Sequence, residues 1–409
     1  MKGARAMAYE TLSSLYYKRP DAWKAEYQAR FHNPFARHFP ISIHQYGYRN
    51  EHPIFYCYTE ESALLQDQIM SIFSGLQTLM QDIPGVGINQ FLKRCLASEI
   101  QSSNDIEGVR STRKEIRAAL MASSKERPQI RLGGIVSKYI KIIQGESLRF
   151  ATCEDIRSFF DDFLSDEIRR NDPALLPDGK IFRASSVDIV TPTQKTIHRG
   201  IYPEEKIIQY MDSALEILND PTIPYFHRMA IFHFLFGYIH PFYDGNGRMS
   251  RFITSYFISR YLHPTIALQL SVILKKERKK YYQFFSTTEL DINKGDLTPF
   301  IIGTLQFVSA AISRTENVLR KKMETYRKYQ QKIAALDIKD ATSISIYDIL
   351  LQASIFSDIG ATSAEIQATV QKAENTVATR LKQMPAEYLK CEKSSRPYHY
   401  SLRLSALDK

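Results

Sequence analysis

Residues 240–251 combine the side chains that phosphate chemistry requires. His240 titrates near about pH 6.5 when unperturbed, so it can act as a base at neutral pH. Asp244 offers a hard oxygen ligand, which suits a magnesium ion carried on phosphates. Arg248 and Arg251 lie three positions apart, which places both guanidinium groups on one face of a helix, within reach of the same polyphosphate.

The backbone of this segment is predicted to form an anion site. Pro241 disfavours helical backbone at His240, so a helix over residues 225–239 should end there. The Gly-Asn-Gly loop that follows permits positive φ and close backbone approach. A second helix over about residues 247–260 begins next, and its free N–H groups attract anions. A plain turn between two helices explains the glycines alone, but not the whole set of side chains.

The segment resembles the Fic family signature, His-x-Phe-x-Asp/Glu-Gly-Asn-Gly-Arg-x-x-Arg, at every fixed position. The resemblance implies that His240 deprotonates a target hydroxyl, whose oxygen attacks the α-phosphate of ATP while pyrophosphate leaves. It implies that Asp244 holds Mg²⁺ on the α- and β-phosphates and that Phe242 anchors the loop in the core. The phosphate-binding residues that it implies are Gly245, Asn246, Gly247, Arg248 at the β-phosphate and Arg251 at the γ-phosphate.

The implied function is an autoinhibited protein adenylyltransferase that transfers AMP from ATP to a Tyr, Thr or Ser hydroxyl of a target protein or of the chain itself. One alternative is a hydrolase that removes AMP at the same site. Another is a DNA-binding transcriptional regulator whose core senses nucleotide. The donor also stays open, because the contacts to the base lie outside the signature.

Ser103, Glu107 and Gly108 resemble the inhibitory motif of the same family, Ser/Thr-x-x-x-Glu-Gly/Asn. The resemblance implies that Glu107 pairs with Arg251 and takes the place of the γ-phosphate. ATP could then enter only with its α-phosphate misplaced for in-line attack. The pattern is also a common helix end, in which Glu107 would be solvated.

Two β-like runs around a polar turn predict a hairpin over about residues 182–199. It resembles the flap of the family, which pairs with an extended target segment. An ordinary surface hairpin is the alternative. The candidate docking residues are Val187, Asp188, Ile189 and Val190. Tyr281 and Tyr282 are candidates for the adenine pocket, with core packing as the alternative.

Composition bounds the class of protein. The chain has 409 residues, 44% of them hydrophobic, and a formal net charge of +10. A basic balance favours anionic partners. The four cysteines form no Cys-x-x-Cys pair, so we expect reduced thiols in a cytoplasmic protein. No signal-like segment follows Met1, and the apolar runs 231–239 and 266–274 are too short to span a bilayer, so no membrane contact is expected.

Periodicity predicts a mainly α fold: a Fic-type helical bundle with a β-hairpin flap, then a C-terminal winged helix-turn-helix. Residues 1–58 should be irregular with short helices, and the flap should be the one clear β element of the bundle. The predicted domains are an N-terminal helical region (1–100), an inhibitory helix region (101–122), the Fic catalytic core (123–310), a connecting helix (311–340) and the winged helix-turn-helix (341–409). Helices are expected at 60–80, 89–102, from 113, at 134–144, 154–167, 203–218, 225–239, 247–260, 276–291 and 297–333.

The tail is predicted to hold helices at 344–353, 362–370 and 373–384, then strands at 388–392 and 397–402. This order is typical of a winged helix-turn-helix. DNA is a candidate partner, and protein docking or homodimerisation is the alternative. The residues that could contact DNA phosphates or bases are Lys372, Asn375, Thr376, Thr379, Arg380, Lys382, Lys390, Lys393 and Arg396, and Glu374, Glu387 and Glu392 dilute their charge.

Overall fold

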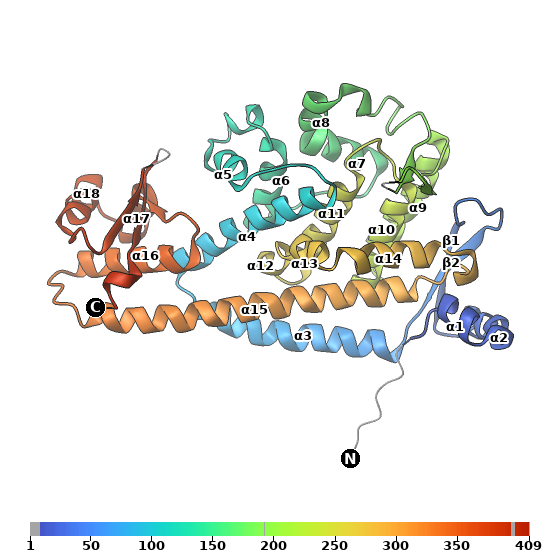
Figure 1. Ribbon diagram of the computed structural model, residues 1–409, viewed down its shortest axis with the longest axis horizontal. Helices are drawn as coiled ribbons and strands as arrows, with labels where there is room; N and C mark the ends of the chain where they lie inside the picture. Colours follow the sequence, from blue (N-terminus) through green and yellow to red (C-terminus); the bar gives the residue numbers. More distant parts are fainter. Residues whose placement is uncertain (1–8, 192, 394–396, 409) are drawn as a thin grey trace, which may run out of the picture. The chain divides into compact units, whose positions relative to one another are not determined.

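The computed structural model describes residues 9–191, 193–393 and 397–408, and most of them are helical (Figure 1). Packing divides the chain into two compact units, residues 1–71 with 99–311 and residues 72–98 with 312–409. Three long helices contribute residues to both units: α3 (Glu60–Gln81), α4 (Gly85–Ile106) and α15 (Thr298–Ala334). The five-part domain division expected from the sequence stays a prediction.

The first unit begins with α1 (Leu12–Lys18), α2 (Pro20–Phe31) and an antiparallel hairpin of β1 (Ala36–Ile43) and β2 (His52–Cys57). The short helices predicted for residues 1–58 are therefore confirmed, but the prediction that the rest is irregular was wrong, as was the prediction of a single β element in the bundle. Phe39, Ile41 and Ile43 do alternate into the core, as a half-buried strand requires. Pro40 interrupts that run, and a proline inside a run argues against a strand.

The core of this unit is built around α10 (Tyr225–Ile239), which is apolar and buried on nearly every side. A helix with no polar face must be surrounded by others. Its neighbours include α9 (Glu204–Asn219) and α11 (Asn246–Tyr261), which is also largely buried. A helix was expected to begin at residue 203, but Pro203 occupies the N-cap position and α9 begins one residue later.

Local signals explain the helices that surround this core. Thr112 and Glu115 form a capping box at the start of α5 (Arg113–Met121), where a helix was expected from residue 113. Thr152 and Asp155 form a second box at α7 (Cys153–Phe160). The other elements of this unit are η1 (Arg127–Gln129), α6 (Gly133–Gln144), η2 (Asp161–Ser165), α8 (Asp166–Asn171), η3 (Pro173–Leu175), α12 (Pro264–Ala267), α13 (Leu270–Lys276), α14 (Arg278–Glu289) and η4 (Asp291–Asn293).

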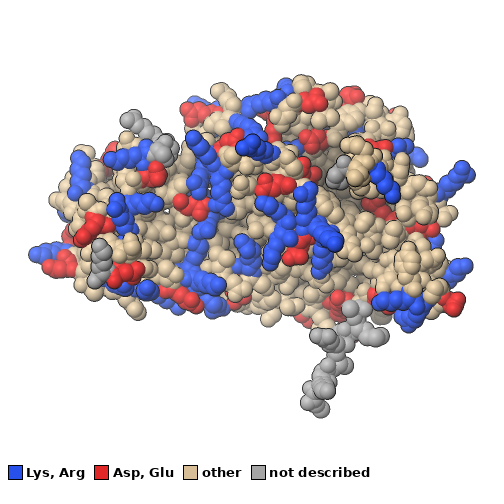
Figure 2. Space-filling view, in the orientation of Figure 1, with Lys and Arg blue, Asp and Glu red and all other residues tan. Residues whose placement is uncertain are grey.

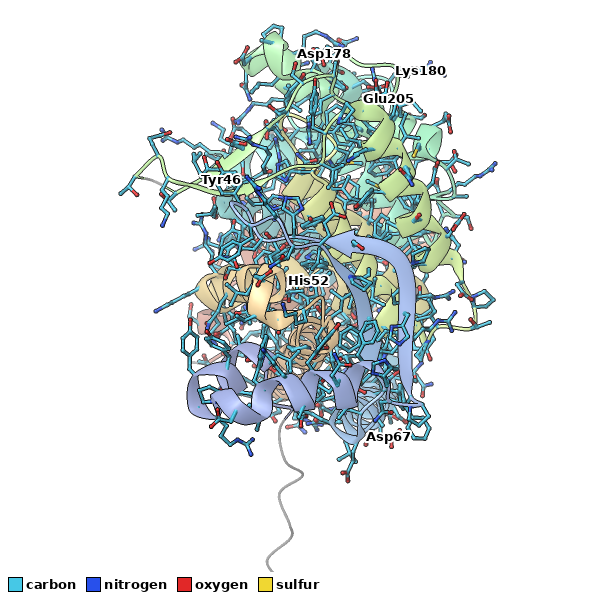
Figure 3. The ribbon with its side chains drawn as sticks, turned by 90° about the vertical axis from the view of Figure 1, so that its right-hand side faces the viewer. Tyr46, His52, Asp67, Asp178, Lys180 and Glu205 are labelled. Atoms are coloured by element: carbon cyan, nitrogen blue, oxygen red, sulfur yellow. The ribbon has the colours of Figure 1, made fainter. Side chains whose placement is uncertain are left out.

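The predicted flap hairpin is present as β3 (Asp188–Val190) paired with β4 (Thr196–Arg199). Pro192 of its turn lies outside the described residues. In Figure 3, Tyr46 from the loop between β1 and β2 lies beside this hairpin, and the guanidinium of Arg199 sits 5.4 Å from the Tyr46 ring centroid. The N-terminal hairpin thus supports the flap from the side.

The second unit contains α16 (Ala341–Phe356), β5 (Ala361–Thr362), α17 (Ser363–Val370), α18 (Glu374–Gln383), β6 (Leu389–Glu392), β7 (His399–Leu402) and η5 (Leu404–Ala406). The three predicted helices and the final hairpin are confirmed, and β5 adds a third strand in the order β5-β7-β6. The assignment of this region as a winged helix-turn-helix stays a prediction.

The four cysteines are free thiols, and Cys391 is the least buried of them. Among the described residues, no helix is both long enough and apolar enough to cross a bilayer.

Candidate functional site

His240 ends α10 in a left-handed conformation, with φ 52° and ψ 61°. A non-glycine residue with positive φ needs support from its surroundings. Arg183 supplies it: its Nε donates to the carbonyl of His240 at 2.9 Å, and its other nitrogens donate to the carbonyls of Ser185 and Ile201. Arg183 is fully buried, and burial lowers its pKa to about 10. This arginine ties the chain leading into the flap to the turn that carries His240.

The imidazole of His240 is half-buried, and its Nδ1 lies 3.3 Å from the carbonyl of Gly237. A hydrogen bond from Nδ1–H to that carbonyl leaves Nε2 as the unprotonated nitrogen. Burial lowers the pKa of His240 to about 4, with smaller contributions from His198 and Arg183. The imidazole is therefore neutral at pH 7, the form that can accept a proton.

The loop after His240 is stabilised by a buried ring and by hydrogen bonds within the loop. Phe242 is fully buried and stacks on Phe160, with ring centroids 3.9 Å apart and planes 12° apart. Asn246 closes the loop: its Oδ1 accepts the N–H of Phe242 at 3.0 Å, and its Nδ2 donates to the Phe242 carbonyl at 2.7 Å. Gly245 has φ 88° and packs against Leu164, so both backbone and space favour glycine there.

Replacing Phe242 with alanine should lower the free energy of unfolding by about 3–5 kcal/mol, because a buried aromatic ring would leave a cavity. Denaturant unfolding of the purified protein would measure the loss. Phe35→Ala is the matched control, since Phe35 is 70% exposed. Equal losses in the two variants would contradict the anchoring role of Phe242.

The two arginines of the motif are both buried, and each already contacts carboxylates. Arg248 pairs with Asp244, Nη2 to Oδ2 at 2.9 Å, and more loosely with Glu167 at 3.4 Å. Among the described residues, neither oxygen of Glu167 has a hydrogen-bond partner, and neither do Nε and Nη1 of Arg248. Buried donors without partners are costly, so Arg248 is ready to bind a further anion.

Sequence reasoning missed Glu167 and the role of Arg183. Glu167 is 6% exposed, and burial raises its pKa. The sequence signal for a buried Glu167 was its place in a predicted helix between the apolar Leu164 and Ile168. For Arg183 no local signal exists, because its acceptors are carbonyls of distant residues.

Arg251 is bound by the segment that resembles the inhibitory motif. Its Nη1 lies 2.7 Å from Oε1 of Glu107, its Nε donates to Oγ of Ser103 at 3.0 Å, and its Nη2 donates to the Ser103 carbonyl at 2.8 Å. Burial alone would raise the pKa of Glu107, but the charge and hydrogen bond of Arg251 outweigh it and lower that pKa. The ion pair is therefore intact at neutral pH.

Glu107 also lies against the first turn of α11. A Cβ built on Gly247 would collide with Oε1 of Glu107, so a larger residue there would displace this carboxylate from its position. The helix N-terminus that was predicted to bind an anion thus holds the carboxylate of Glu107. α4 extends to Ile106, beyond the predicted end at 102, so Ser103 is helical. Gly108 follows Glu107 with φ 73°.

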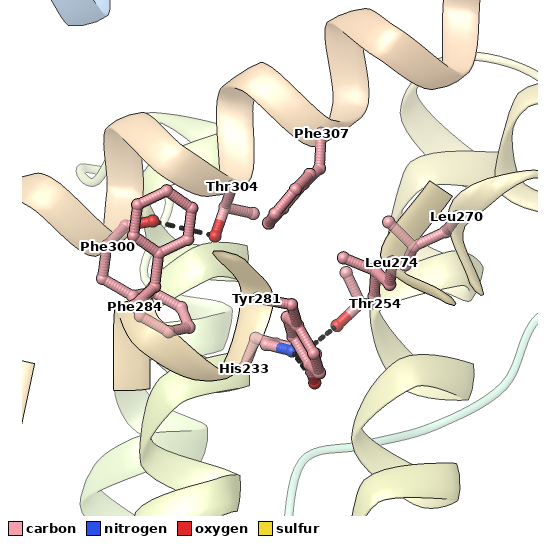
Figure 4. A pocket seen from close by; sticks show the side chains of 9 residues that line it. All are labelled: His233, Thr254, Leu270, Leu274, Tyr281, Phe284, Phe300, Thr304 and Phe307. Carbon is pink, nitrogen blue, oxygen red and sulfur yellow. Dashed lines mark hydrogen bonds between the residues drawn. The ribbon is translucent and has the colours of Figure 1, made fainter. Parts of the chain in front are cut away.

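The candidate adenine residues lie in different surroundings. Tyr281 is buried, and its hydroxyl is 3.0 Å from Nε2 of His233 inside a hollow of the core (Figure 4). Tyr282 is 43% exposed, and its hydroxyl donates to the carbonyl of Ile106 at the end of α4. The structure therefore places Tyr282 beside Glu107, while Tyr281 packs in the interior. A role for either ring in adenine binding stays a prediction.

The flap residues form a mostly apolar, partly exposed edge. Asp188 pairs with Arg199 across the hairpin, at 2.6 Å and 2.8 Å. Val190 is 42% exposed, whereas Val187 and Ile189 are half-buried. Exposed apolar residues on a short hairpin suit pairing with another chain. Target docking here stays a prediction.

The histidine at a turn, the glycine loop and the arginines around a helix N-terminus together form an arrangement that suits phosphate groups. Residues 153–258 match the family model described as Fic/DOC family. The chain thus contains a segment that matches the Fic/DOC family over residues 153–258.

Known relatives and structures agree with this assignment. Protein adenylyltransferase Fic from Drosophila sechellia is 32% identical over 95 residues, which are 23% of this chain and 18% of that protein. The protein of the same name from Drosophila virilis is 38% identical over 72 residues, 18% of this chain and 13% of that protein. The chain thus matches less than a fifth of the length of these relatives.

A crystal structure of a Fic family protein from Desulfovibrio desulfuricans G20 superposes with a TM-score of 0.51. The two sequences are 17% identical, and the alignment covers 85% of this chain and 97% of that one. The likeness confirms the mainly α, Fic-type fold predicted from the sequence.

Proposed function

We propose that this protein is an adenylyltransferase that transfers AMP from ATP to a hydroxyl of a protein, and that Glu107 holds it inactive. One observation carries the proposal: a neutral His240 and the N-terminus of α11 flank one loop, with Arg248 and Arg251 on that helix. A base beside an anion site suits attack of a hydroxyl on a phosphate.

In the proposed reaction, Nε2 of His240 takes the proton of the acceptor hydroxyl. The hydroxyl oxygen bonds to the α-phosphorus as the bond to pyrophosphate breaks. Arg248 and Arg251 donate to the β- and γ-phosphates and stabilise the charge that develops on the leaving group. The N–H groups at the start of α11 contribute from fixed positions, which requires little reorganisation.

Asp244 is the candidate ligand for Mg²⁺. In the part of the chain that the structure describes, no three His, Cys, Asp or Glu side chains gather into a metal site. A single carboxylate suits Mg²⁺, which proteins usually bind together with substrate phosphates, and the ion would neutralise phosphate charge there. Glu167 would keep Arg248 paired once Asp244 turned to the ion.

Mass spectrometry of the full chain tests the function and the donor. The Glu107→Gly variant would be incubated with Mg²⁺ and, separately, with ATP, GTP, CTP and UTP. With ATP we expect a mass increase of one AMP on a Tyr, Thr or Ser of the chain itself or of an added protein mixture. A larger yield with another nucleotide would change the donor, and no adduct with any nucleotide would overturn the proposal.

The pH dependence follows from the lowered pKa of His240. A base works in its neutral form, and a pKa of about 4 keeps His240 neutral throughout the physiological range. The Glu107→Gly variant should therefore transfer AMP at a constant rate between about pH 6 and 8. Because Glu107 raises the pKa of His240, its removal moves the acid limb to still lower pH. A rate that halves near pH 6.5 would indicate an unperturbed histidine instead.

Removal of AMP is a second candidate activity of the same site. Glu107 binds Arg251 through Oε1, while 30% of its side chain is exposed, so water can reach the carboxylate. A carboxylate in that position can orient a water toward an AMP ester. Release of AMP from a modified protein by the wild type, and not by Glu107→Gly, would distinguish this activity.

DNA binding by residues 341–409 stays a proposal. In and beside α18, Lys372, Asn375 and Lys382 are exposed, whereas Arg380 contacts Asp340 at 3.4 Å. Arg396 lies outside the described residues. A salt-dependent gel shift with the full chain would test it, and the absence of binding at low salt would favour protein docking or self-association.

A further inference from the structure

Five of the six residues from Lys275 to Lys280 are basic, and Glu277 is the one acid among them. These residues end α13 and begin α14, and all six are exposed. We call the five basic side chains, Lys275, Lys276, Arg278, Lys279 and Lys280, the basic turn. Figure 2 shows Lys and Arg side chains gathered over α13 and the start of α14.

The charge that opens α14 opposes local stability, whereas Lys275 and Lys276 in the last turn of α13 suit the negative end of that helix. The first turn of α14 carries three cations and no acid, although the positive end of a helix dipole favours acidic residues. Within the described part of the chain, Lys276 and Lys279 form no ion pair. When charges are unfavourable for a helix and no ion pair compensates for them, a role in binding a partner is the expected reason for their presence.

The basic turn already binds one carboxylate. Nζ of Lys275 lies 2.6 Å from Oδ2 of Asp105, two residues before Glu107. Arg278 lies over the ring of Tyr282, 5.6 Å from its centroid, and Tyr282 donates to the carbonyl of Ile106. The end of α4 is therefore an acidic segment of the chain itself, held at the edge of the basic turn.

From these contacts we propose that the basic turn is a docking surface for an acidic segment of the protein substrate, which competes with Asp105 for Lys275. The proposal rests on the proposed function for the identity of the partner. Glutamate or aspartate side chains fit because a carboxylate occupies the surface already. Binding of the substrate withdraws Lys275 from Asp105. The end of α4, beside Glu107, then loses the ion pair that stabilises it. Substrate docking and release of the lock are thereby coupled.

Peptide binding tests the proposal without ATP or AMP transfer. The probe is a fluorescein-labelled oligoglutamate peptide, and its anisotropy is measured with the nucleotide-free full chain at low and high salt. Lys276→Gln with Lys279→Gln should weaken binding about tenfold at low salt, because two unpaired charges are lost. Lys24→Gln with Lys321→Gln is the control, since both residues are exposed and the change in net charge is the same. Equal binding by both double variants would overturn the docking surface.

Asp105→Asn tests the competition. Removing an exposed ion-pair partner should strengthen peptide binding by about twofold to fivefold, the range expected from one surface ion pair. Unchanged binding would overturn the competition with Asp105. Tighter binding of a single-stranded RNA of the same length, lost in the Lys276 and Lys279 double variant, would overturn an acidic protein as the partner. These experiments measure peptide binding and not AMP transfer. Failure of the docking surface can therefore be distinguished from failure of the proposed adenylyltransferase function.

Discussion

Replacing His240 with alanine should reduce AMP transfer about 10²- to 10⁴-fold, because a positioned base contributes that much to a proton transfer. The structure gives the reason for expecting a large effect: the imidazole is neutral, its Nδ1 faces the Gly237 carbonyl, and Arg183 fixes its backbone. Incorporation of label from α-labelled ATP, measured in a Glu107→Gly background, would give the rate.

The control for this variant is His32→Ala, since His32 is exposed on the chain after α2 and distant in sequence from the motif. Its rate should equal that of the parent. Nucleotide binding by His240→Ala should be nearly unchanged, because His240 acts on the acceptor and not on the phosphates. Full labelling by His240→Ala would remove His240 from the mechanism.

Replacing Glu107 with glycine should raise AMP transfer about 10- to 100-fold. The γ-phosphate would gain Arg251 as a partner, and hydrogen bonds to charged groups contribute about 1.5–3 kcal/mol. In the absence of ATP the same variant should be less stable. Breaking a buried ion pair costs about 3–5 kcal/mol, and we expect the lower end because Glu107 keeps 30% of its side chain in water.

The two effects of Glu107→Gly can be separated by adding ATP. ATP should raise the melting temperature of the variant more than that of the wild type, because its phosphates would restore a partner to Arg251. Glu51→Gly, at an exposed loop position, is the control for introducing glycine. Equal activity and equal ATP stabilisation in wild type and Glu107→Gly would contradict the lock.

Local chemistry explains which parts of the site were predictable. Pro241 and the glycines determine where α10 ends and α11 begins, so the loop and the helix N-terminus follow from neighbouring residues. The same holds for the start of α5 at Arg113, which the capping box of Thr112 and Glu115 determines. These features depend on contacts within a few residues, which a sequence displays directly.

Features that depend on distant contacts were less accessible. The support of His240 by Arg183 joins residues 57 positions apart, and the packing of Glu167 against Arg248 depends on two helices meeting. The β1 strand was missed because Pro40 interrupts its alternation of buried and exposed residues. The pairing of Glu107 with Arg251 could be expected from resemblance alone, since nothing in their spacing brings them together.

The position of Glu107 at the end of α4 limits how low the activity of the wild-type protein can be. Glu107 follows Ile106, the last residue of α4, and Gly108 follows it in a left-handed conformation. Helix ends fray, so exposing Arg251 requires only the last turn to unwind. If the frayed form lay about 3 kcal/mol above the closed form, roughly one molecule in 150 would be frayed at any moment. Wild-type protein would then have a steady background activity. The rate of that activity would measure the stability of a single helical turn.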